Sequence, residues 1–247
     1  MLRHRYLVPR LYVDAPLAPG ARLALPAEAA HHAVNVLRLR EGEDIVLFNG
    51  LGGEYPARIR GLAKKSAEVE LGAYAAVERE SRLHATLLQG LSSADRMDYT
   101  VQKAVELGVA AIQPAACEKS VVRLSEERAA SRQAHWRRVA IAACEQCGRN
   151  RVPQILPLLR LTNVRLPEGA LGIVLAPDAT ATLGSMMAGK PAAVVLAIGP
   201  EAGFSEAEER ALTVSGFQPV KLGERILRTE TAGPAALAVL NSLSGEF

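Results

Sequence analysis

Apolar, strand-like runs and helical segments alternate from residue 85 to the C-terminus, and this alternation constrains the fold more than any other feature of the sequence. Segments with apolar residues at helical spacing include 96–107 and 131–147. Such alternation is typical of a mostly parallel, doubly wound sheet, so the sequence predicts an α/β domain. The strand-like runs cover residues 85–91, 109–112, 171–176, 192–198 and 218–222.

The first 75 residues or so show a different pattern, in which short strand-like runs are separated by glycine-containing turns. One helix is predicted from about residue 26 to residue 39. Closely spaced strands with such turns favour a small β-barrel. Residues 74–82 look like a linker, so we expect a barrel domain at 1–74 and an α/β domain at 82–247. The short runs cover residues 6–8, 22–25, 44–48, 55–60 and 67–71.

Two helices near the C-terminus have recognisable start signals. Ser205 and Glu208 have the spacing of a capping box, which predicts a helix that begins there. The last helix is predicted from about Thr231 to residue 243. If Thr231 is its N-cap, Pro234 falls in the first turn, where the missing N–H costs little.

The composition excludes membrane and secreted classes. Hydrophobic residues make up 49% of the 247-residue chain and charged residues 22%, as in globular proteins with a buried core. No apolar run approaches the roughly 20 residues of a membrane-spanning helix, and the first residues do not resemble a secretory signal. We therefore expect a cytoplasmic protein with no membrane partner.

The three cysteines do not indicate a metal site. Cys144 and Cys147 have C-x-x-C spacing, but Cys117 is the only other cysteine. A zinc site needs about four ligands, and no pair of histidines with ligand spacing lies nearby. We expect reduced cysteines in the core and no bound metal.

Positive charge is concentrated in the middle of the chain. Residues 118–165 contain ten Lys or Arg and four Asp or Glu, a local excess of +6, whereas the net charge of the whole chain is +3. A local basic excess can be the footprint of a polyanion such as RNA. A solvated helix face explains the charge equally well.

Two loops follow apolar runs and precede helices, and together they predict a ligand pocket, because ligands of α/β sheets bind at the carboxyl ends of the strands. The first loop, residues 198–205, has neither a Walker sequence nor G-x-G-x-x-G. Glu201, Glu206 and Glu208 would repel phosphate there. A ligand with a positive charge and no phosphate, such as S-adenosylmethionine, suits this loop better. A plain strand-to-helix turn is the alternative for one loop, but two loops at neighbouring strand ends favour a pocket.

The second loop, residues 222–232, crowds arginines, threonines and Glu230 into one short connection. Ile226 and Leu227 at its centre predict a loop that is tucked into the protein. Backbone groups of such a loop need hydrogen-bond partners, and adenine has donor and acceptor edges that can supply them.

Residues 142–151 combine Glu145 with Arg149 and Arg151 at the end of the long predicted helix. Arginines at a helix C-terminus favour the helix dipole, so a cap is one interpretation. A patch that contacts nucleic-acid phosphate or bases is the other.

The chain resembles the RsmE family of 16S ribosomal RNA uridine-N3 methyltransferases, in the SPOUT superfamily of knotted methyltransferases. The resemblance extends over essentially the whole chain, and the last two of its motifs are highly specific. Its motifs lie at residues 32–42, 97–108, 143–149, 198–205 and 222–232.

This resemblance implies a PUA-like β-barrel that binds RNA, followed by a SPOUT α/β domain with a deep trefoil knot. It implies a homodimer that uses S-adenosylmethionine to methylate N3 of the uridine at position 1498 of 16S rRNA, in the assembled 30S subunit. The cofactor would contact three loops. The residues implied are Leu175, Ala176, Pro177, Ile198, Gly199, Pro200, Glu201, Gly203, Phe204, Leu222, Gly223, Ile226, Leu227, Arg228 and Thr231.

Other groups are candidates for catalysis and RNA binding. Arg228 would stabilise the uracil anion, and Glu230 or Glu145 would remove the N3 proton. Two positions depart from the family pattern: Ala202 replaces a glycine and would be strained at positive φ, and Gly233 replaces a larger residue. The candidate RNA contacts are Arg3, Arg5, Arg10, Arg38, Arg40, Arg123, Arg149 and Arg151.

Three alternatives are also compatible with the sequence. The chain could be an RNA-binding ribosome-assembly factor whose α/β domain is only structural. It could be a SPOUT methyltransferase that modifies another RNA position. A hydrolase or kinase-like nucleotide enzyme is disfavoured by the missing phosphate-binding motifs.

Overall fold

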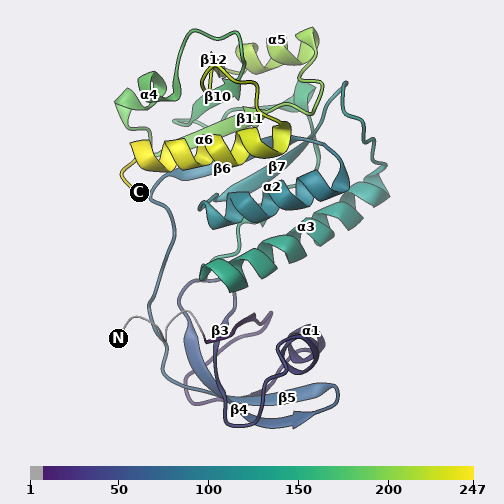
Figure 1. The fold of residues 1–247 in the computed structure, drawn as a ribbon, viewed down its shortest axis with the longest axis vertical. Coiled ribbons are helices and arrows are strands. Elements are labelled where there is room, and N and C mark those ends of the chain that lie inside the picture. The colour runs from purple at the N-terminus through teal and green to yellow at the C-terminus, as the bar shows by residue number, and fades with distance from the viewer. Residues whose placement is uncertain (1–7) are drawn as a thin grey trace. The chain divides into compact units, whose positions relative to one another are not determined.

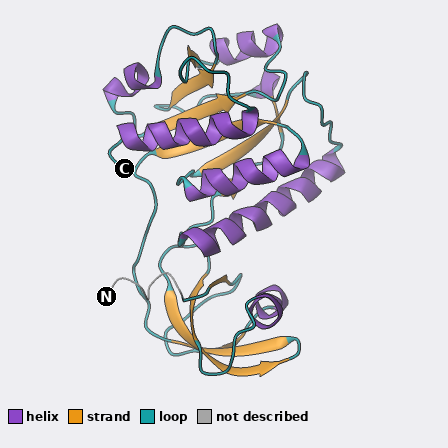
Figure 2. Cartoon of the chain, viewed as in Figure 1, coloured by secondary structure: helices purple, strands orange, loops and turns teal. Residues whose placement is uncertain are grey.

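The computed structural model describes residues 8–247, which divide into two compact units. The first unit extends to Glu80 and also takes in Cys144–Val152. The second unit consists of Ser81–Ala143 and Pro153–Phe247. Their boundary lies within the predicted linker, but the segment Cys144–Val152 had been assigned to the second domain. Figures 1 and 2 show the elements of each unit.

The first unit is built on a five-stranded sheet with the order β1-β3-β4-β5-β2. Four of its strands match predicted runs. The strand β1 was not predicted, and it pairs with β3 in parallel. The run predicted at 6–8 lies almost entirely outside the described residues. The strands are β1 (Arg10–Tyr12), β2 (Arg22–Ala24), β3 (Asp44–Phe48), β4 (Tyr55–Ala63) and β5 (Ser66–Leu71).

One helix packs on this sheet and closes the core of the first unit. It begins as α1 (Ala27–His31) and continues as the π-helical turn η1 (His32–Val36). The helix ends about three residues earlier than predicted, because Arg38 has a left-handed φ of 54° that no helix can continue through. Its buried face joins the core formed by Leu11, Val13, Leu25, Ala29, Ala30, Ala33, Ile45, Leu47, Ala57, Ile59, Ala67, Val69 and Leu71.

The second unit contains a seven-stranded sheet with the order β12-β10-β11-β6-β7-β8, and β9 also pairs with β7. Every pairing in this sheet is parallel. The α/β prediction is therefore confirmed. The strands are β6 (His84–Gly90), β7 (Ala111–Ala116), β8 (Gln154–Ile155), β9 (Leu159–Arg160), β10 (Leu171–Leu175), β11 (Ala193–Ile198) and β12 (Gln218–Val220).

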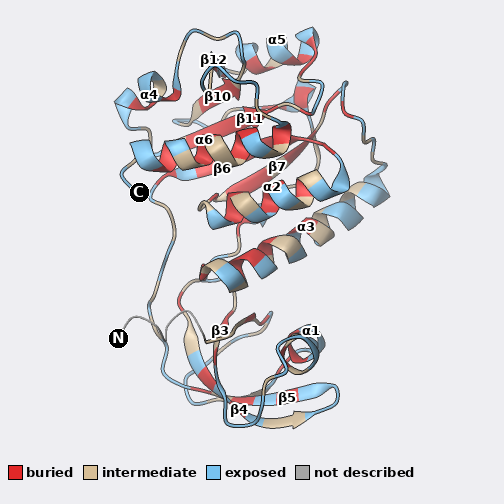
Figure 3. Ribbon diagram, in the orientation of Figure 1, coloured by how far each residue is buried: buried red, intermediate tan, exposed pale blue. Residues whose placement is uncertain are grey.

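Helices cover both faces of this sheet. On one face, α2 (Ala94–Glu106) and α6 (Thr229–Leu243) lie side by side (Figure 1). On the other face, α5 (Glu206–Val214) and the 3-10 turn η2 (Leu161–Asn163) enclose a second core. The long helix α3 (Glu126–Cys147), α4 (Leu183–Met186) and the 3-10 turn η3 (Met187–Gly189) complete the chain. Figure 3 shows how burial concentrates on the strands between the helices.

The starts of the two C-terminal helices differ in how well they were predicted. The Ser205–Glu208 capping box is present, since the Ser205 N–H donates to Glu208 at 2.8 Å and the Glu208 N–H donates to Ser205 Oγ at 3.2 Å. The prediction for α6 was wrong, because its N-cap is Arg228 rather than Thr231. Pro234 therefore lies in the second turn.

The trefoil knot stays a prediction from the family resemblance. None of the helices in residues 8–247 is long and apolar enough to cross a membrane.

Candidate functional site

A cavity of about 890 Å³ lies at the carboxyl end of the parallel sheet. Its size falls within the roughly 300–1,000 Å³ that is usual for small-molecule sites. Three loops form its wall: the loop after β10, the loop after β11, and residues 222–230 after β12. All of these residues belong to the second unit.

Almost every residue predicted to hold a cofactor lines this cavity, from Leu175 in the first loop to Arg228 in the third. Thr231 does not line it and is exposed on α6. Thr229, two residues earlier, lines the cavity instead. The reason is the early start of α6, which turns the Thr231 position outward.

The two predicted loops are not at neighbouring strands as expected. β10 lies between β11 and β12 in the sheet. The loop after β10, which includes Asp178 and Ala179, therefore forms the middle of the wall. Strand order depends on long-range pairing, so the sequence pattern could not reveal this arrangement.

Glycines let the loop after β11 fold tightly against its neighbours. A Cβ on Gly199 would lie 3.1 Å from Gly203 Cα, and a Cβ on Gly90 would lie 2.6 Å from the Pro200 nitrogen. Gly203 itself has a φ of 72°, which other residues adopt only with strain. Ala202 is not among the described residues with positive φ, so the expected strain does not arise there.

A buried hydroxyl ties this loop to the start of α6. Thr229 Oγ1 donates to the Gly199 carbonyl at 2.7 Å and accepts from Gln89 Nε2 at 2.8 Å. Gln89, on β6, is fully buried, and Thr229 is 7% exposed. The backbone of the loop after β11 is thus held by a side chain of the last helix and, through it, by β6.

An arginine that sequence reasoning missed joins two acidic residues of the wall. Arg96 Nη1 donates to Glu201 Oε1 at 2.8 Å, and Arg96 Nε lies 3.6 Å from Glu230 Oε1. The second oxygen of Glu230 is buried and accepts no hydrogen bond from the residues described. The only sequence feature that could have indicated Arg96 as a site residue is its place in the first turn of α2, shortly after β6.

The carboxylate of Glu201 is held in its charged form. Burial alone would raise the pKa of Glu201, but its own backbone N–H, the Arg96 guanidinium and the Ser93 N–H together lower it. Glu206 and Glu208 do not contribute the negative charge that was expected. Glu206 points to solvent, and Glu208 is buried in the capping box and accepts from the Glu118 N–H.

The connection 222–232 is more exposed than predicted. Ile226 lines the cavity yet is 84% exposed, and Arg228 is exposed as well. The expectation of a loop buried by the rest of its own chain was therefore wrong. Apolar side chains at its centre face the cavity and solvent, where another molecule can cover them.

Arg149 and Arg10 have internal roles in the first unit. Arg149 is 3% exposed and forms an ion pair and hydrogen bonds with Glu80. Arg10 donates to Glu54 at 2.6 Å and to Asn150 at 2.5 Å. Burial therefore excludes Arg149 and largely excludes Arg10 as contacts for RNA phosphate in this structure, contrary to the prediction.

Glu145, one of the two candidate bases, also belongs to the first unit. It accepts from the Tyr12 N–H at 2.9 Å and lies 3.5 Å from His32 Nδ1. Burial raises the pKa of Glu145, against the opposing effects of the Tyr12 N–H and His32. Glu145 does not line the cavity, whereas Glu230 does.

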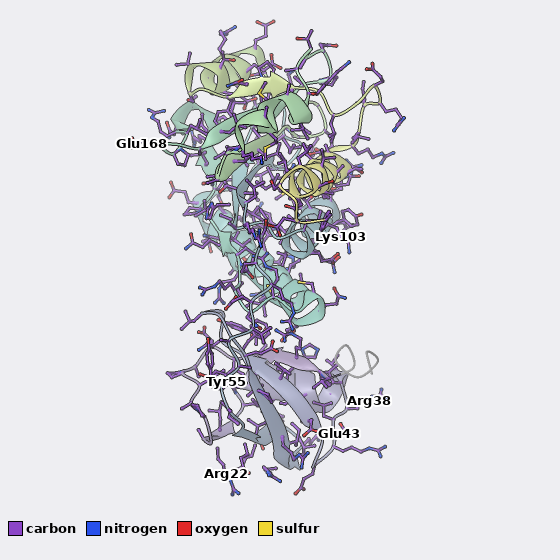
Figure 4. All side chains as sticks on the ribbon, turned by 90° about the vertical axis from the view of Figure 1, so that its left-hand side faces the viewer. Arg22, Arg38, Glu43, Tyr55, Lys103 and Glu168 are labelled. Atoms are coloured by element: carbon purple, nitrogen blue, oxygen red, sulfur yellow. The ribbon has the colours of Figure 1, made fainter. Side chains whose placement is uncertain are left out.

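The remaining RNA candidates differ in exposure. Arg38, Arg40 and Arg123 are exposed, and Figure 4 labels Arg38 on the first unit. Arg151 is 56% exposed and lies 3.6 Å from Glu78. The predicted contacts Arg3 and Arg5 lie outside the described residues.

Two of the three cysteines are unsuited to thiolate chemistry. Burial raises the pKa of Cys117 and of Cys144 to about 12, so both thiols stay protonated at neutral pH. Within residues 8–247, no group of three potential ligands could hold a metal ion.

Comparison with protein families gives two matches. The family described as RNA methyltransferase domain matches residues 79–241, and the family described as RNA methyltransferase PUA domain matches residues 25–72. Together they cover both units.

Individual relatives resemble the whole chain. Ribosomal RNA small subunit methyltransferase E of Buchnera aphidicola subsp. Schizaphis graminum is 32% identical over 246 residues, which cover 97% of this chain and 98% of that protein. The crystal structure of a ribosomal RNA small subunit methyltransferase E from Neisseria gonorrhoeae, bound to S-adenosyl methionine, has a TM-score of 0.89 at 42% identity and covers 96% of this chain and 98% of that one. A methyltransferase from Legionella pneumophila, in complex with SAM, has a TM-score of 0.91 at 39% identity over 95% of this chain and 97% of that one.

Proposed function

Since the chain belongs to the ribosomal RNA small subunit methyltransferase E family, we propose that it methylates N3 of a uridine in 16S rRNA with S-adenosylmethionine as the methyl donor. The observation that carries this proposal is the cavity at the carboxyl ends of β10, β11 and β12. The solved relative from Neisseria gonorrhoeae was crystallised with the same cofactor.

The residues of the cavity fit S-adenosylmethionine. Glycines at 199, 203 and 223 leave backbone groups accessible to a ligand, while Ile226 and Leu227 offer apolar surface for adenine. The lining holds four acidic residues and three arginines, and this small excess of negative charge suits a sulfonium cation better than phosphate. When bound, this cofactor supplies an electrophilic methyl group.

The chain's own residues would prepare the uridine for attack. N3 of uracil carries a proton at neutral pH, and that proton must leave before N3 can act as a nucleophile. The unpartnered, buried oxygen of Glu230 supports a role as proton acceptor. Arg228 is an exposed cation on the same wall and forms no ion pair with the described residues, so its guanidinium can stabilise the negative charge on the uracil oxygens.

The oligomeric state, the cellular compartment, the form of the substrate and the knot are proposed from the family resemblance. The enzyme would act as a homodimer in the cytoplasm, on the assembled 30S subunit, with the C-terminal segment threaded through a knot. The basic residues of the central region favour an RNA partner.

Mass spectrometry of RNA nucleosides tests the proposal. Purified protein is incubated with S-adenosylmethionine and 30S subunits from a strain that lacks the corresponding gene. We expect 3-methyluridine to form in 16S rRNA, and a methylated ribose or guanine instead would assign a different target. If no methylation occurs and calorimetry detects no cofactor binding, the assembly-factor alternative is favoured. If binding occurs, the Gly199→Val and Leu227→Asp variants should lose it.

A further inference from the structure

One side of α3 carries arginines without acidic partners. From Arg128 to Ala143 this helix contains four arginines and neither aspartate nor glutamate. Arg128, Arg132 and Arg138 are all exposed. None of the three takes part in an ion pair within the described part of the chain. Elsewhere in the protein, many arginines are paired, including Arg10, Arg22, Arg58, Arg60, Arg79, Arg96, Arg149, Arg151 and Arg210.

These three side chains share one side of the helix. At 100° per residue, Arg128, Arg132 and Arg138 fall within roughly 120° of arc, and they are separated along the axis by about 6 Å and about 9 Å. Trp136, Ala140 and Ala143 form the buried stripe, whose middle lies roughly 110° around the helix from the middle of this arc. We call the exposed set Arg128, Arg132 and Arg138 the arginine face of α3. Figure 3 shows that this helix has exposed residues along much of its length.

Stability of the helix does not explain this arrangement. Arg128 and Arg132 are four residues apart, and like charges at this spacing destabilise a helix. Arginines are favourable near a helix C-terminus, but Arg128 and Arg132 lie in its first third. In α5, by contrast, an arginine has an acidic partner one turn earlier, an arrangement that stabilises a helix. Arg210 Nη1 lies 3.6 Å from Glu206 Oε2.

The arginine face is connected to the cavity through α2. His135, which lies within the same arc, contacts Asp98 of α2 with 2.8 Å between Nε2 and Oδ2. Two residues before Asp98 on α2 is Arg96, which lines the cavity and holds Glu201. A polyanion seated on the arginine face would therefore lie one helix away from the elements that form the cavity wall.

We propose that the arginine face of α3 binds backbone phosphates of the substrate RNA. The guanidinium group forms paired hydrogen bonds with phosphate oxygens, and a surface of unpaired cations complements a polyanion. The assignment rests on the proposed function, since it takes the RNA substrate as the partner. The arginine face lies at a different position from the cavity, and it would bind a different ligand.

A salt-dependence experiment tests this proposal with full-length protein and 30S subunits. Each phosphate contact contributes about 0.7 to the slope of log affinity against log salt for single-stranded nucleic acid. The triple variant Arg128→Gln/Arg132→Gln/Arg138→Gln should therefore lower that slope by about two. Its KM for 30S subunits should rise about tenfold at moderate salt, while calorimetry should give the wild-type affinity for S-adenosylmethionine.

A charge-matched control is available elsewhere on the chain. Arg22→Gln/Arg160→Gln/Arg210→Gln removes the same charge from exposed positions outside this face and should leave the slope almost unchanged. Equal effects of the two triple variants, or a wild-type slope and KM in the first, would overturn the proposal. If the first triple variant does not fold, each single variant should lower the slope by about 0.7, and an unchanged slope in all three would overturn it equally.

The two proposals fail in different ways. Absence of 3-methyluridine with the wild-type protein contradicts the proposed reaction. Normal methylation by the wild type, together with unaltered salt dependence in the variants, contradicts the arginine face alone.

Discussion

The connection 222–232 and the segment Cys144–Val152 have similar residue types but opposite environments. Both combine arginines with a glutamate or a neighbouring carboxylate at a helix end. In the connection, Arg228 and Ile226 are exposed and line a cavity. In the segment, Arg149 is 3% exposed and donates to Glu80. Asn150 is 0% exposed, donates to Glu54 and accepts from Arg10.

The contrast shows that a cluster of arginines in a sequence does not by itself identify a site. Charged groups that pair inside one unit stabilise it, because an unpaired buried charge is costly. Charged groups that remain exposed at the edge of a cavity are available to a ligand. Four substitutions test this difference, beginning with the one from which we expect the largest effect.

Arg228→Ala should abolish most methyl transfer while leaving the cofactor bound. Loss of one preorganised group that stabilises developing charge lowers kcat about 100- to 1,000-fold. Single-turnover kinetics on 30S subunits gives the rate, and calorimetry gives the affinity for S-adenosylmethionine. Wild-type turnover in this variant would remove Arg228 from the mechanism.

Arg149→Ala should act on stability instead. Its side chain is 4% exposed and pairs with Glu80, and removing one partner of a buried pair costs about 3 kcal/mol. Urea unfolding measures the loss, and cofactor affinity should stay close to the wild-type value. The exposed, weakly paired Arg22 is the control, because Arg22→Ala should cost less than about 1 kcal/mol.

Thr229→Val should weaken cofactor binding about tenfold, or about 1.4 kcal/mol, because it removes the hydrogen bonds to Gly199 and Gln89. Thr229→Ser keeps the hydroxyl and should restore most of the affinity. Thr162→Val, at an exposed threonine of η2, should change nothing. If valine and serine at position 229 weaken binding equally, the hydroxyl does not position the loop.

Glu145→Gln should have the smallest effect of the four, a change in how the melting temperature depends on pH. Burial raises the pKa of Glu145 above its ordinary value of 4.5, so the folded state binds this proton more tightly than the unfolded state. Its contribution to stability is therefore fully present below pH 4.5 and is lost as the pH rises through the raised pKa. The glutamine variant cannot ionise, so its melting temperature should rise relative to the wild type over this range.

Thermal unfolding of both proteins between about pH 4 and about pH 8 measures this difference. The exposed Glu168, substituted by glutamine, serves as the control. A constant difference in melting temperature across the range would show that Glu145 titrates alike in the folded and unfolded states.

The sequence was most informative where local signals agree with the fold. The capping box at Ser205 and the strands β3 to β5 lie where they were predicted, because their turn residues and periodicity are local. The loops after β11 and β12 were also found from local patterns, whereas the loop after β10 was implied only by the family resemblance. The start of α6 was missed because the tertiary contact of Thr229 with Gly199 determines it.

The environment of individual side chains could not be predicted from the sequence. Arg149 looked like an RNA contact because the sequence does not show Glu80 beside it. Arg96 was overlooked because its partners Glu201 and Glu230 lie more than 100 residues away in the chain. Pairings over such separations depend on topology, which a local pattern does not contain.

The segment Cys144–Val152 has a consequence for protein synthesis. Arg10, Glu54 and Arg79 can contact Asn150 and Gly148 only after about three-fifths of the chain has been made. At about 5–20 residues per second, the ribosome needs several seconds to pass from the end of the first sheet to this segment. During that interval Arg10 and Glu54 can pair with each other, but both still lack their contacts with this segment. The first unit is therefore complete only once the middle of the chain has been made.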